Sequence, residues 1–455
     1  MMKEIATRYI ILLLFLELCA CNKILDEKSD KKLVVPATLT DLQSILDNAQ
    51  RNIFSDPSAG EVSTDDYYLL DKDYKALTID ADRRLYSWES DYVFEEKSNS
   101  WSYGYASIYG ANTVLEGLNK LDREAVGAAL YDDIKGRALY LRAKTMLQLA
   151  ALFVPAFEAE TASKEMGLPI RMSTDFNIPT ARSSVLATYT MIVDDLSQAA
   201  ELLSIIPKQM TRPSKPAALG LLARTYLWMG QYDKAEAAAN ACLQLFSTLL
   251  DYNQVNASAS YPFAQFNAET IVFSVIGMPS ILSPDIAKIS LALYDEYHEG
   301  DLRKELFFKR NMDGSVSFRG SYTGNQTPFG GVSTNEIMLI KAETMVRNGK
   351  YMAGMEVLQA LLSKRWKTGY SDSALNQVKT PDDALDLVLK ERRKELLMRG
   401  LRWMDVKRLN REGKNISMRR FIDGKEYVLS PNDKRYALAI PEDIITFTGI
   451  QQNPR

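Results

Sequence analysis

A pattern of ten small and apolar positions occurs twice in this sequence, within residues 223–243 and again within residues 342–362. In each copy these residues recur every three or four positions, the spacing that places side chains on one face of an α-helix. A glycine interrupts both copies at the same point, Gly230 in the first and Gly349 in the second. Each copy therefore predicts two antiparallel helices that join at a glycine turn and pack closely through their small residues.

Helix pairs of this kind are the unit of tetratricopeptide-like repeats, which stack so that each pair covers the apolar face of the next. A third copy of the first helix begins near Ala143, and its partner follows only near Tyr189, because residues 154–182 contain three prolines and are typical of an extended insertion. We predict a mainly α fold in which the repeats form a right-handed scaffold, with long irregular loop regions and a few short strands. The expected repeats lie at about residues 130–153, 184–247, 335–365 and 382–410, and the expected irregular binding region lies at about residues 50–100 and 250–335.

The N-terminus has the layout of an export signal. Lys3 and Arg8 accompany an apolar run at residues 9–16, and Leu18-Cys19-Ala20-Cys21 follows. A small residue before the cleavage point and a cysteine after it are typical of bacterial lipoproteins, and Ala20 favours Cys21 over Cys19 as the lipidated residue. A transmembrane anchor is the alternative, which Glu17 and a run shorter than the ~18 residues of a span disfavour. The expected N-terminal segments are a lipoprotein signal peptide at residues 1–20, the lipidated Cys21 and a flexible tether at residues 21–35.

Composition argues against several classes of function. The formal net charge is −3, from 55 Lys and Arg and 58 Asp and Glu residues without a long basic run, so we expect no nucleic-acid partner. The only histidine is His298, and Cys242 falls on the apolar stripe of a predicted helix, so this chain cannot build a Ser-His-Asp or Cys-His catalytic arrangement. Because glycine-rich phosphate loops and Cys/His clusters with metal spacing are also missing from the sequence, we expect no cofactor and no metal.

A series of short motifs runs along nearly all of the chain after the signal peptide. In chain order they are Asp41-Leu42-Gln43-Ser44-Ile45-Leu46-Asp47-Asn48, Trp101 with Tyr105, Arg142-Ala143, Gly167-Leu168-Pro169, Arg212-Pro213-Ser214, Ile340-Lys341-Ala342-Glu343, Glu391-Arg392-Arg393-Lys394-Glu395-Leu396, Gly400-Leu401-Arg402-Trp403-Met404-Asp405 and Gln452-Asn453-Pro454. Each motif is weak singly, but their order together resembles the SusD/RagB family of outer-membrane nutrient-binding lipoproteins. One departure is Arg455, which stands where the family often has glycine.

The resemblance implies a single SusD-like domain at residues 36–455, anchored by lipid to the outer membrane and exposed at the cell surface. It also implies that the protein binds an oligomeric nutrient, most often a glycan and sometimes a peptide, and delivers it to a SusC-like TonB-dependent transporter. Catalysis is not implied. Two alternatives remain: a tetratricopeptide-type lipoprotein scaffold that grips a peptide or an assembly partner, and an enzyme that cleaves polysaccharides.

A glycan-cleaving enzyme needs two carboxyl groups that flank the scissile bond. Adjacent acids occur as Asp65-Asp66, Glu95-Glu96, Asp132-Asp133 and Asp382-Asp383. Asp382-Asp383 follows Pro381, where the start of a helix favours acids. Only Asp65-Asp66 has the surroundings of a site, since Tyr67-Tyr68 follows it in a region without helical periodicity. We interpret this pair as a ligand contact rather than a catalytic dyad.

Aromatic rings hold the apolar faces of sugars, and such rings must lie off the core. Trp101, Trp228 and Trp403 fall within helical stripes and are expected to pack internally. Aromatic residues in the irregular segments are the better candidates, with local packing or the transporter interface as the alternative interpretation. The candidate ligand-binding residues are Asp66, Tyr67, Tyr68, Trp88, Tyr92, Tyr261, Phe263, Tyr322 and Phe329.

Overall fold

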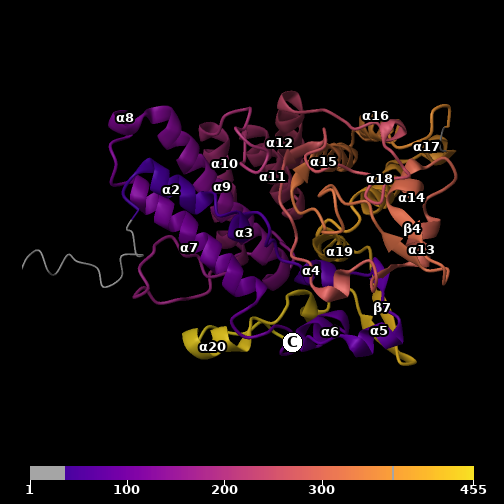
Figure 1. Cartoon of the computed structure of the whole chain (residues 1–455), viewed down its shortest axis with the longest axis horizontal. Coiled ribbons are helices and arrows are strands. Elements are labelled where there is room, and N and C mark those ends of the chain that lie inside the picture. The colour runs from indigo at the N-terminus through magenta and orange to yellow at the C-terminus, as the bar shows by residue number, and fades with distance from the viewer. Residues whose placement is uncertain (1–35, 371–372) are drawn as a thin grey trace, which may run out of the picture.

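The computed structural model describes residues 36–370 and 373–455, and the predicted signal peptide, Cys21 and tether lie outside the described residues. α-Helices dominate the structure (Figure 1), and the strands are only two to five residues long. The prediction of a mainly α fold with helical repeats, irregular loops and a few short strands is confirmed.

The helices of the N-terminal part are α2 (Leu39–Leu46), α3 (Ala49–Asn52), α4 (Ala59–Val62), α5 (Asp71–Ala76), α6 (Asp80–Tyr86), α7 (Ser100–Leu118), α8 (Arg123–Val126) and α9 (Ala128–Phe153). The later helices are α10 (Val185–Leu202), α11 (Lys215–Trp228), α12 (Tyr232–Leu245), α13 (Leu291–Asp295), α14 (Leu302–Leu306), α15 (Thr334–Arg347), α16 (Tyr351–Leu362), α17 (Ser373–Gln377), α18 (Pro381–Glu395), α19 (Arg402–Arg411) and α20 (Glu442–Thr448). The strands are β1 (Tyr67–Tyr68), β2 (Thr270–Val272), β3 (Lys288–Ile289), β4 (Phe308–Arg310), β5 (Val316–Phe318), β6 (Val332–Ser333), β7 (Met418–Ile422) and β8 (Lys425–Leu429).

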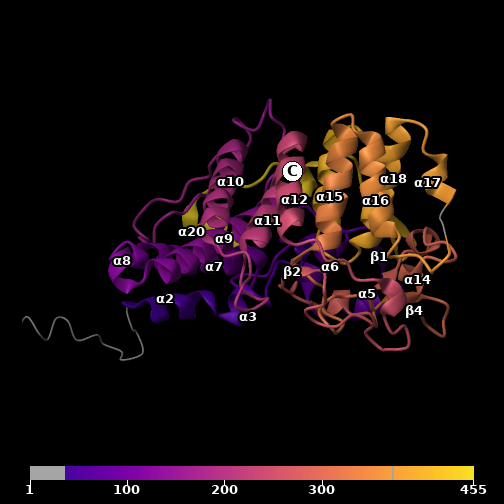
Figure 2. The ribbon, with the colours of Figure 1, turned by 90° about the horizontal axis from the view of Figure 1, so that it is seen from above.

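The helix pairs stack in the order of the sequence. α9 packs on α10, α10 on α11, α11 on α12, α12 on α15, and α15 on both α16 and α18. Figure 2 shows α12, α15, α16 and α18 upright beside one another. The turns inside the two sequence copies place Gly230 at φ 68° and Gly349 at φ 79°, a backbone conformation that L side chains rarely adopt. The glycine at the same position of each copy is therefore a requirement of the turn.

Polar residues at the helix starts explain where several helices begin. α18 begins with a capping box, in which the Thr380 hydroxyl accepts from the Asp383 backbone N–H and the Asp383 carboxylate accepts from the Thr380 N–H. Pro381 occupies the first turn, where its missing N–H costs nothing. The interpretation of Asp382-Asp383 as a helix start is confirmed.

The irregular segments lie against the helices and are held by four separate two-stranded antiparallel pairs. β1 pairs with β3, which joins the segment at residues 50–100 to the segment at residues 250–335. β2 pairs with β6, which leads directly into α15. β4 pairs with β5, and the hairpin of β7 and β8 follows α19. One hydrophobic core runs continuously from the helical repeats into these segments.

A buried group of charges joins the helices to the irregular segments, and Glu395 at the end of α18 lies at its centre. The Glu395 carboxylate accepts hydrogen bonds from Arg303 (3.1 Å), Arg365 (2.7 Å) and Asn335 (2.8 Å). Arg303 lies in α14, Arg365 follows α16 and Asn335 lies in α15. Arg303, Arg365 and Asn335 are fully buried. Residues far apart in sequence are thus tied together by one carboxylate.

Further acids complete the charge balance of this group. Arg303 also pairs with Asp301 (2.8 Å) and Glu391 (2.6 Å). Arg365 pairs with Glu269 (2.7 Å), which also accepts from the backbone N–H of Leu250 (2.9 Å). Burial of a charge is tolerated when partners and hydrogen bonds satisfy it, and these guanidinium groups meet that condition.

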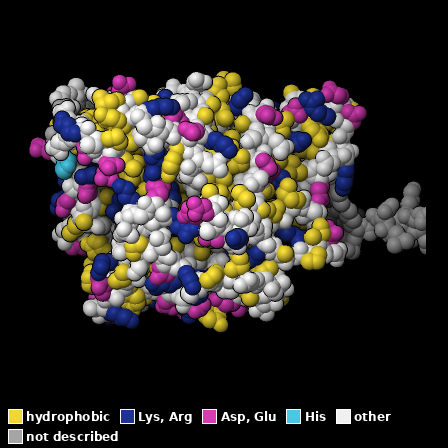
Figure 3. Space-filling view, turned by 180° about the vertical axis from the view of Figure 1, so that it is seen from behind, with side chains coloured by type: hydrophobic (Ala, Val, Ile, Leu, Met, Phe, Trp, Pro, Cys, Tyr) yellow, Lys and Arg dark blue, Asp and Glu magenta, His cyan; other side chains and the backbone are white. Residues whose placement is uncertain are grey.

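The surface carries charges of both signs. Lys and Arg are interspersed with Asp and Glu over the face in Figure 3, in keeping with the small net charge. Within the described ranges, none of the helices has the length and apolar character that crossing a membrane requires.

We predict that Ala223→Leu and Ala342→Leu each lower the free energy of unfolding by about 1–3 kcal/mol, because extra methyl and methylene groups must force packed helices apart. Both alanines are fully buried. Ala237→Leu is the matched control, since Ala237 lies exposed on α12. Urea denaturation measures the three variants. Unchanged midpoints for the Ala223 and Ala342 variants would contradict the close packing of the repeats.

Candidate functional site

Most of the ligand-binding residues predicted from the sequence lie in the core. Six of the nine have exposed fractions between 0% and 4%, namely Asp66, Tyr67, Trp88, Phe263, Tyr322 and Phe329. The expectation that these residues lie off the core is therefore wrong. The irregular backbone around them follows no helical period, but it folds inward and fills the space beside the helices, so periodicity did not identify their burial.

Hydrogen bonds and cation–π contacts hold these buried rings in place. The Trp88 indole N–H donates to the Ser63 carbonyl (2.9 Å), and the Tyr322 hydroxyl donates to Glu269 (2.7 Å). The Arg420 guanidinium lies 4.6 Å from the Trp88 ring centroid and 5.4 Å from that of Tyr67. These contacts satisfy the polar atoms of the rings within the protein. The buried aromatic residues therefore serve internal packing.

The Asp65-Asp66 pair is bound by arginines. Asp65 forms a two-pronged contact with Arg402 (2.9 and 3.1 Å), and Arg393 bridges Asp65 (3.1 Å) and Asp66 (3.0 Å). Burial acts to raise the pKa of Asp65, but the Arg402 and Arg393 charges outweigh it and hold that pKa well below its ordinary value. Asp65 and Asp66 therefore belong to a cluster of ion pairs within the protein.

The other three candidates have solvent access. Tyr92 is 60% exposed and Tyr261 is 37% exposed, whereas Tyr68 is half-buried. Another exposed aromatic pair, Tyr109 on α7 and Phe176 in the insertion, was not among the sequence candidates. Their rings stack with centroids 5.3 Å apart. Phe176 lies in a proline-rich aperiodic segment, which was a usable signal.

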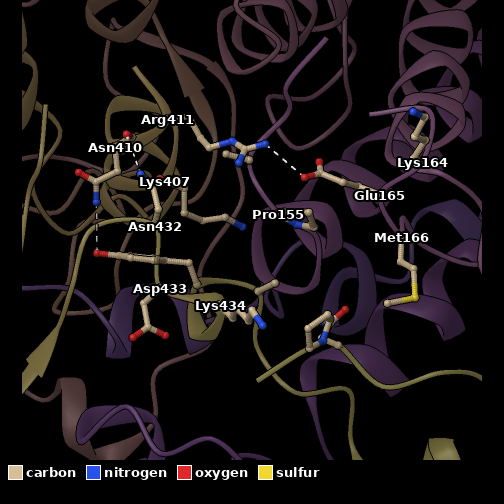
Figure 4. Close-up of a pocket in the computed structure, with 15 residues that line it drawn as sticks. Pro155, Lys164, Glu165, Met166, Lys407, Asn410, Arg411, Asn432, Asp433 and Lys434 are labelled. Atoms are coloured by element: carbon tan, nitrogen blue, oxygen red, sulfur yellow. Dashed lines mark hydrogen bonds and ion pairs between the residues drawn. The ribbon is translucent and has the colours of Figure 1, made fainter. Parts of the chain in front are cut away.

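A cavity of about 360 Å³ lies apart from these residues, where the insertion, α19 and the end of the chain meet. We call it the C-terminal cavity, and Figure 4 shows its lining. The lining residues are Pro155, Ala156, Lys164, Glu165, Met166, Lys407, Asn410, Arg411, Asn432, Asp433, Lys434, Tyr436, Ala437, Asn453 and Pro454. Its volume falls within the range of small-molecule sites.

Lys407 on α19 closes the inner wall of the cavity and is only 2% exposed. Its ammonium donates to the backbone carbonyls of Ala151 (2.7 Å) and Val154 (2.6 Å) at the C-terminal end of α9. A cation at this end of a helix satisfies carbonyls that have no partner within the helix and opposes the negative end of the dipole. Burial nevertheless lowers the pKa of Lys407 to about 7.

Asn453 completes the end of the same helix. Its amide donates to the carbonyls of Phe153 and Leu438, both at 2.8 Å, and its side-chain oxygen accepts from Arg182 (2.7 Å). The backbone N–H of Leu438 donates to the Leu152 carbonyl (2.8 Å). The Asn-Pro motif near the end of the chain therefore positions one wall of the cavity against α9.

The outer part of the cavity carries charged groups. Arg411 pairs with Glu165 (3.2 Å) and Glu158 (3.4 Å), and the second oxygen of Glu165 is buried without a hydrogen-bond partner. Lys164 and Lys434 are exposed at the rim. The cavity thus offers amide, ammonium, guanidinium and carboxylate groups, which suit the hydroxyl and acidic groups of a polar ligand. None of the nine sequence candidates lines it.

The observations define a protein of stacked helix pairs with a long irregular segment packed on one side. Two family models match the chain: the SusD-like model described as starch-binding and associating with the outer membrane, over residues 23–227, and the SusD family model, over residues 334–447. The chain belongs to the SusD/RagB family, as its motifs suggested.

Solved structures share the fold. A SusD superfamily protein from Bacteroides thetaiotaomicron is 24% identical, with a TM-score of 0.75 over 92% of this chain and 100% of that one. A SusD superfamily protein from Bacteroides vulgatus is 19% identical, with a TM-score of 0.74 over 92% and 99%. A SusD-like carbohydrate binding protein from the same species is 18% identical, with a TM-score of 0.69 over 91% and 97%. The search of curated proteins found no match.

We predict that Lys407→Met removes a pH dependence of stability. Between about pH 7, the pKa of Lys407 in the folded chain, and its ordinary value of 10.5, the unfolded chain keeps a proton that the folded chain has lost. Stability rises with pH when the unfolded state binds more protons, so the stability of the wild type minus that of the variant should increase over this range, by at most about 1.4 kcal/mol per pH unit.

Urea denaturation of both proteins at several pH values from 7 to about 10 measures this difference. Lys434→Met, at an exposed lysine of the same cavity, is the control for the loss of a lysine that is not buried. If the stability difference between the wild type and Lys407→Met does not change with pH, burial does not lower the pKa of Lys407.

Proposed function

We propose that the protein binds an oligomeric nutrient, a glycan, and delivers it to a SusC-like TonB-dependent transporter of the outer membrane. The observation that carries this proposal is the pair of SusD family matches in chain order, at residues 23–227 and 334–447. The first model is described as starch-binding and associating with the outer membrane, and one structure of the same fold is a carbohydrate binding protein.

The C-terminal cavity is the part of the structure that best suits such a ligand. Both matched ranges contribute to its wall, the first through Pro155 and Met166 and the second through Lys407 and Tyr436. Its polar groups can exchange hydrogen bonds with sugar hydroxyls. The two lining carboxylates, Glu165 and Asp433, are each paired with an arginine, so the cavity favours binding without cleavage.

The anchor is part of the same proposal. Lipidation of Cys21 would hold residues 36–455 at a membrane surface through the tether, and attachment that lasts takes more than one acyl chain. In this arrangement the helical domain stays outside the bilayer beside its transporter.

We predict that a purified protein beginning at residue 36 binds an oligosaccharide and releases no reducing ends from it. Asn432→Gly, which removes an exposed amide of the C-terminal cavity and tolerates the left-handed backbone of this position (φ 57°), should weaken binding. The melting temperature should fall only by what the lost hydrogen bond to the Asn410 carbonyl (3.2 Å) contributes. Isothermal titration against a panel of neutral and acidic oligosaccharides measures affinity, and a reducing-end assay measures cleavage. Lys208→Gln, at an exposed lysine outside the cavity lining, is the control.

Tyr92→Ala and Tyr261→Ala test the other location for the ligand. If these variants weaken binding and Asn432→Gly does not, the ligand lies on the exposed aromatics of the irregular segments instead of in the cavity. Binding of peptides alone would favour the scaffold alternative, and release of reducing ends would contradict the proposal that the protein only binds.

We predict that Cys21→Ala releases the protein from the outer membrane in cells, because the acyl chains supply the attachment. Fractionation followed by mass spectrometry of the N-terminal peptide tests this. Mature wild-type protein without a lipid mass, together with a Cys21→Ala protein that stays in the outer membrane, would contradict the lipoprotein assignment.

A further inference from the structure

Positive charges outnumber negative charges around the C-terminal cavity. Its lining contains four cationic side chains, of Lys164, Lys407, Arg411 and Lys434, and two acidic side chains, of Glu165 and Asp433. Both acids are already engaged: Glu165 by Arg411 at 3.2 Å, and Asp433 by Arg435 at 2.7 Å. Neither lining carboxylate therefore pairs with Lys164, Lys407 or Lys434.

Arginines behind the lining add to the imbalance. Arg182 donates to the carbonyls of Met166, Gly167 and Gln451 and to the side-chain oxygen of Asn453, all of which are neutral acceptors. Burial lowers the pKa of Arg182 to about 10. Arg455 donates to the Ala437 carbonyl (2.8 Å), and two further nitrogens of its guanidinium are buried without an acceptor. Charges gathered behind a low-dielectric wall focus a positive potential into the cavity.

Lys407 brings one of these charges to the inner wall. An ammonium group has three N–H donors, and the carbonyls of Ala151 and Val154 accept two of them. Figure 4 shows the Lys407 side chain extending in among the lining residues, with Arg411 and Lys434 on neighbouring parts of the wall. Below about pH 7, where Lys407 is in its ammonium form, an oxyanion that enters the cavity can accept the third N–H and supply the missing counter-charge.

We infer that the C-terminal cavity takes an anionic glycan, with the carboxylate of a uronate residue seated against Lys407 and attracted by Lys164 and Lys434 at the rim. The inference rests on the proposed function, because it names the class of glycan that the same cavity would bind. A volume of about 360 Å³ leaves room for a sugar ring beside its acidic group. Pro155, Met166 and Pro454 supply apolar surface for the ring faces.

Isothermal titration at about pH 6, where Lys407 is protonated and the uronate is ionised, tests this inference with trigalacturonate, its fully methyl-esterified form and maltotriose. The ester has the same ring skeleton without the negative charges. The wild type should bind the acid at least about tenfold more tightly than the ester, since hydrogen bonds to charged groups contribute about 1.5–3 kcal/mol. The preference should decrease as salt concentration rises, because the rim charges are exposed to solvent. Inorganic phosphate should compete only weakly, because it lacks the sugar ring.

Two sets of variants test whether the preference for the acid depends on the lysines of the cavity. Lys407→Met should reduce the preference for the acid about tenfold while binding of the ester persists. The double variant Lys164→Gln/Lys434→Gln alters only exposed side chains and should also reduce the preference, so it tests the inference even if Lys407→Met fails to fold. Lys208→Gln is the charge-matched control outside the cavity and should keep the preference. Thermal melts show which variants are folded.

The outcomes separate this inference from the proposed function. Equal affinity for the acid and the ester, or a preference that survives both sets of variants, would overturn the inference while leaving glycan binding intact. Phosphate that binds as tightly as trigalacturonate would assign the cavity to small anions and would also overturn it. Absence of binding to every oligosaccharide tested would overturn both.

Discussion

The Glu395 carboxylate is the point at which the two kinds of structure in this protein are held together. It accepts hydrogen bonds from an arginine after α16, an arginine in α14 and an asparagine in α15. The helical repeats and the irregular segment that contains α14 therefore share one buried acceptor. Removing one partner of a buried ion pair costs about 3–5 kcal/mol, because the other charge is left uncompensated. The irregular segments contain short helices and short strand pairs, so this charge group and the shared hydrophobic core contribute much of what determines where they lie.

The C-terminal cavity depends on a second interaction of the same general kind, the capping of one long helix from outside. The last three residues of α9 (Ala151, Leu152 and Phe153) and its cap residue Val154 have carbonyls that accept from outside the helix. The donors are Lys407, Asn453 and the backbone N–H of Leu438. Because the three donors come from α19, the end of the chain and the segment between them, all of these segments converge on one helix end. The cavity forms where they meet the insertion. Three of the cations at or behind its wall, Lys407, Arg182 and Arg455, donate to carbonyls instead of carboxylates.

Much of the fold could be predicted from the sequence, and most of the site could not. The α11–α12 and α15–α16 pairs, the extended insertion and the internal positions of Trp228, Trp403 and Cys242 all follow from spacing along single segments. Trp88, Tyr322 and Phe329 belong to segments without a period, where exposure depends on what packs against them from elsewhere in the chain. The motif at Gln452-Asn453-Pro454 was visible as a landmark of the family, but its role requires knowing that α9 ends beside it.

By itself, the sequence determined the helices, their glycine turns and the family, because helical periodicity, capping residues and short motifs are properties of neighbouring residues. The proposal of lipid attachment likewise rests on a local signal at the N-terminus. Only the tertiary structure decided which charged and aromatic residues are buried, since a run such as Glu391–Glu395 is equally compatible with a solvated helix face until Arg303 and Arg365 are placed against it. The cavity was likewise decided by tertiary structure, because its walls are contributed by segments that no local pattern brings together.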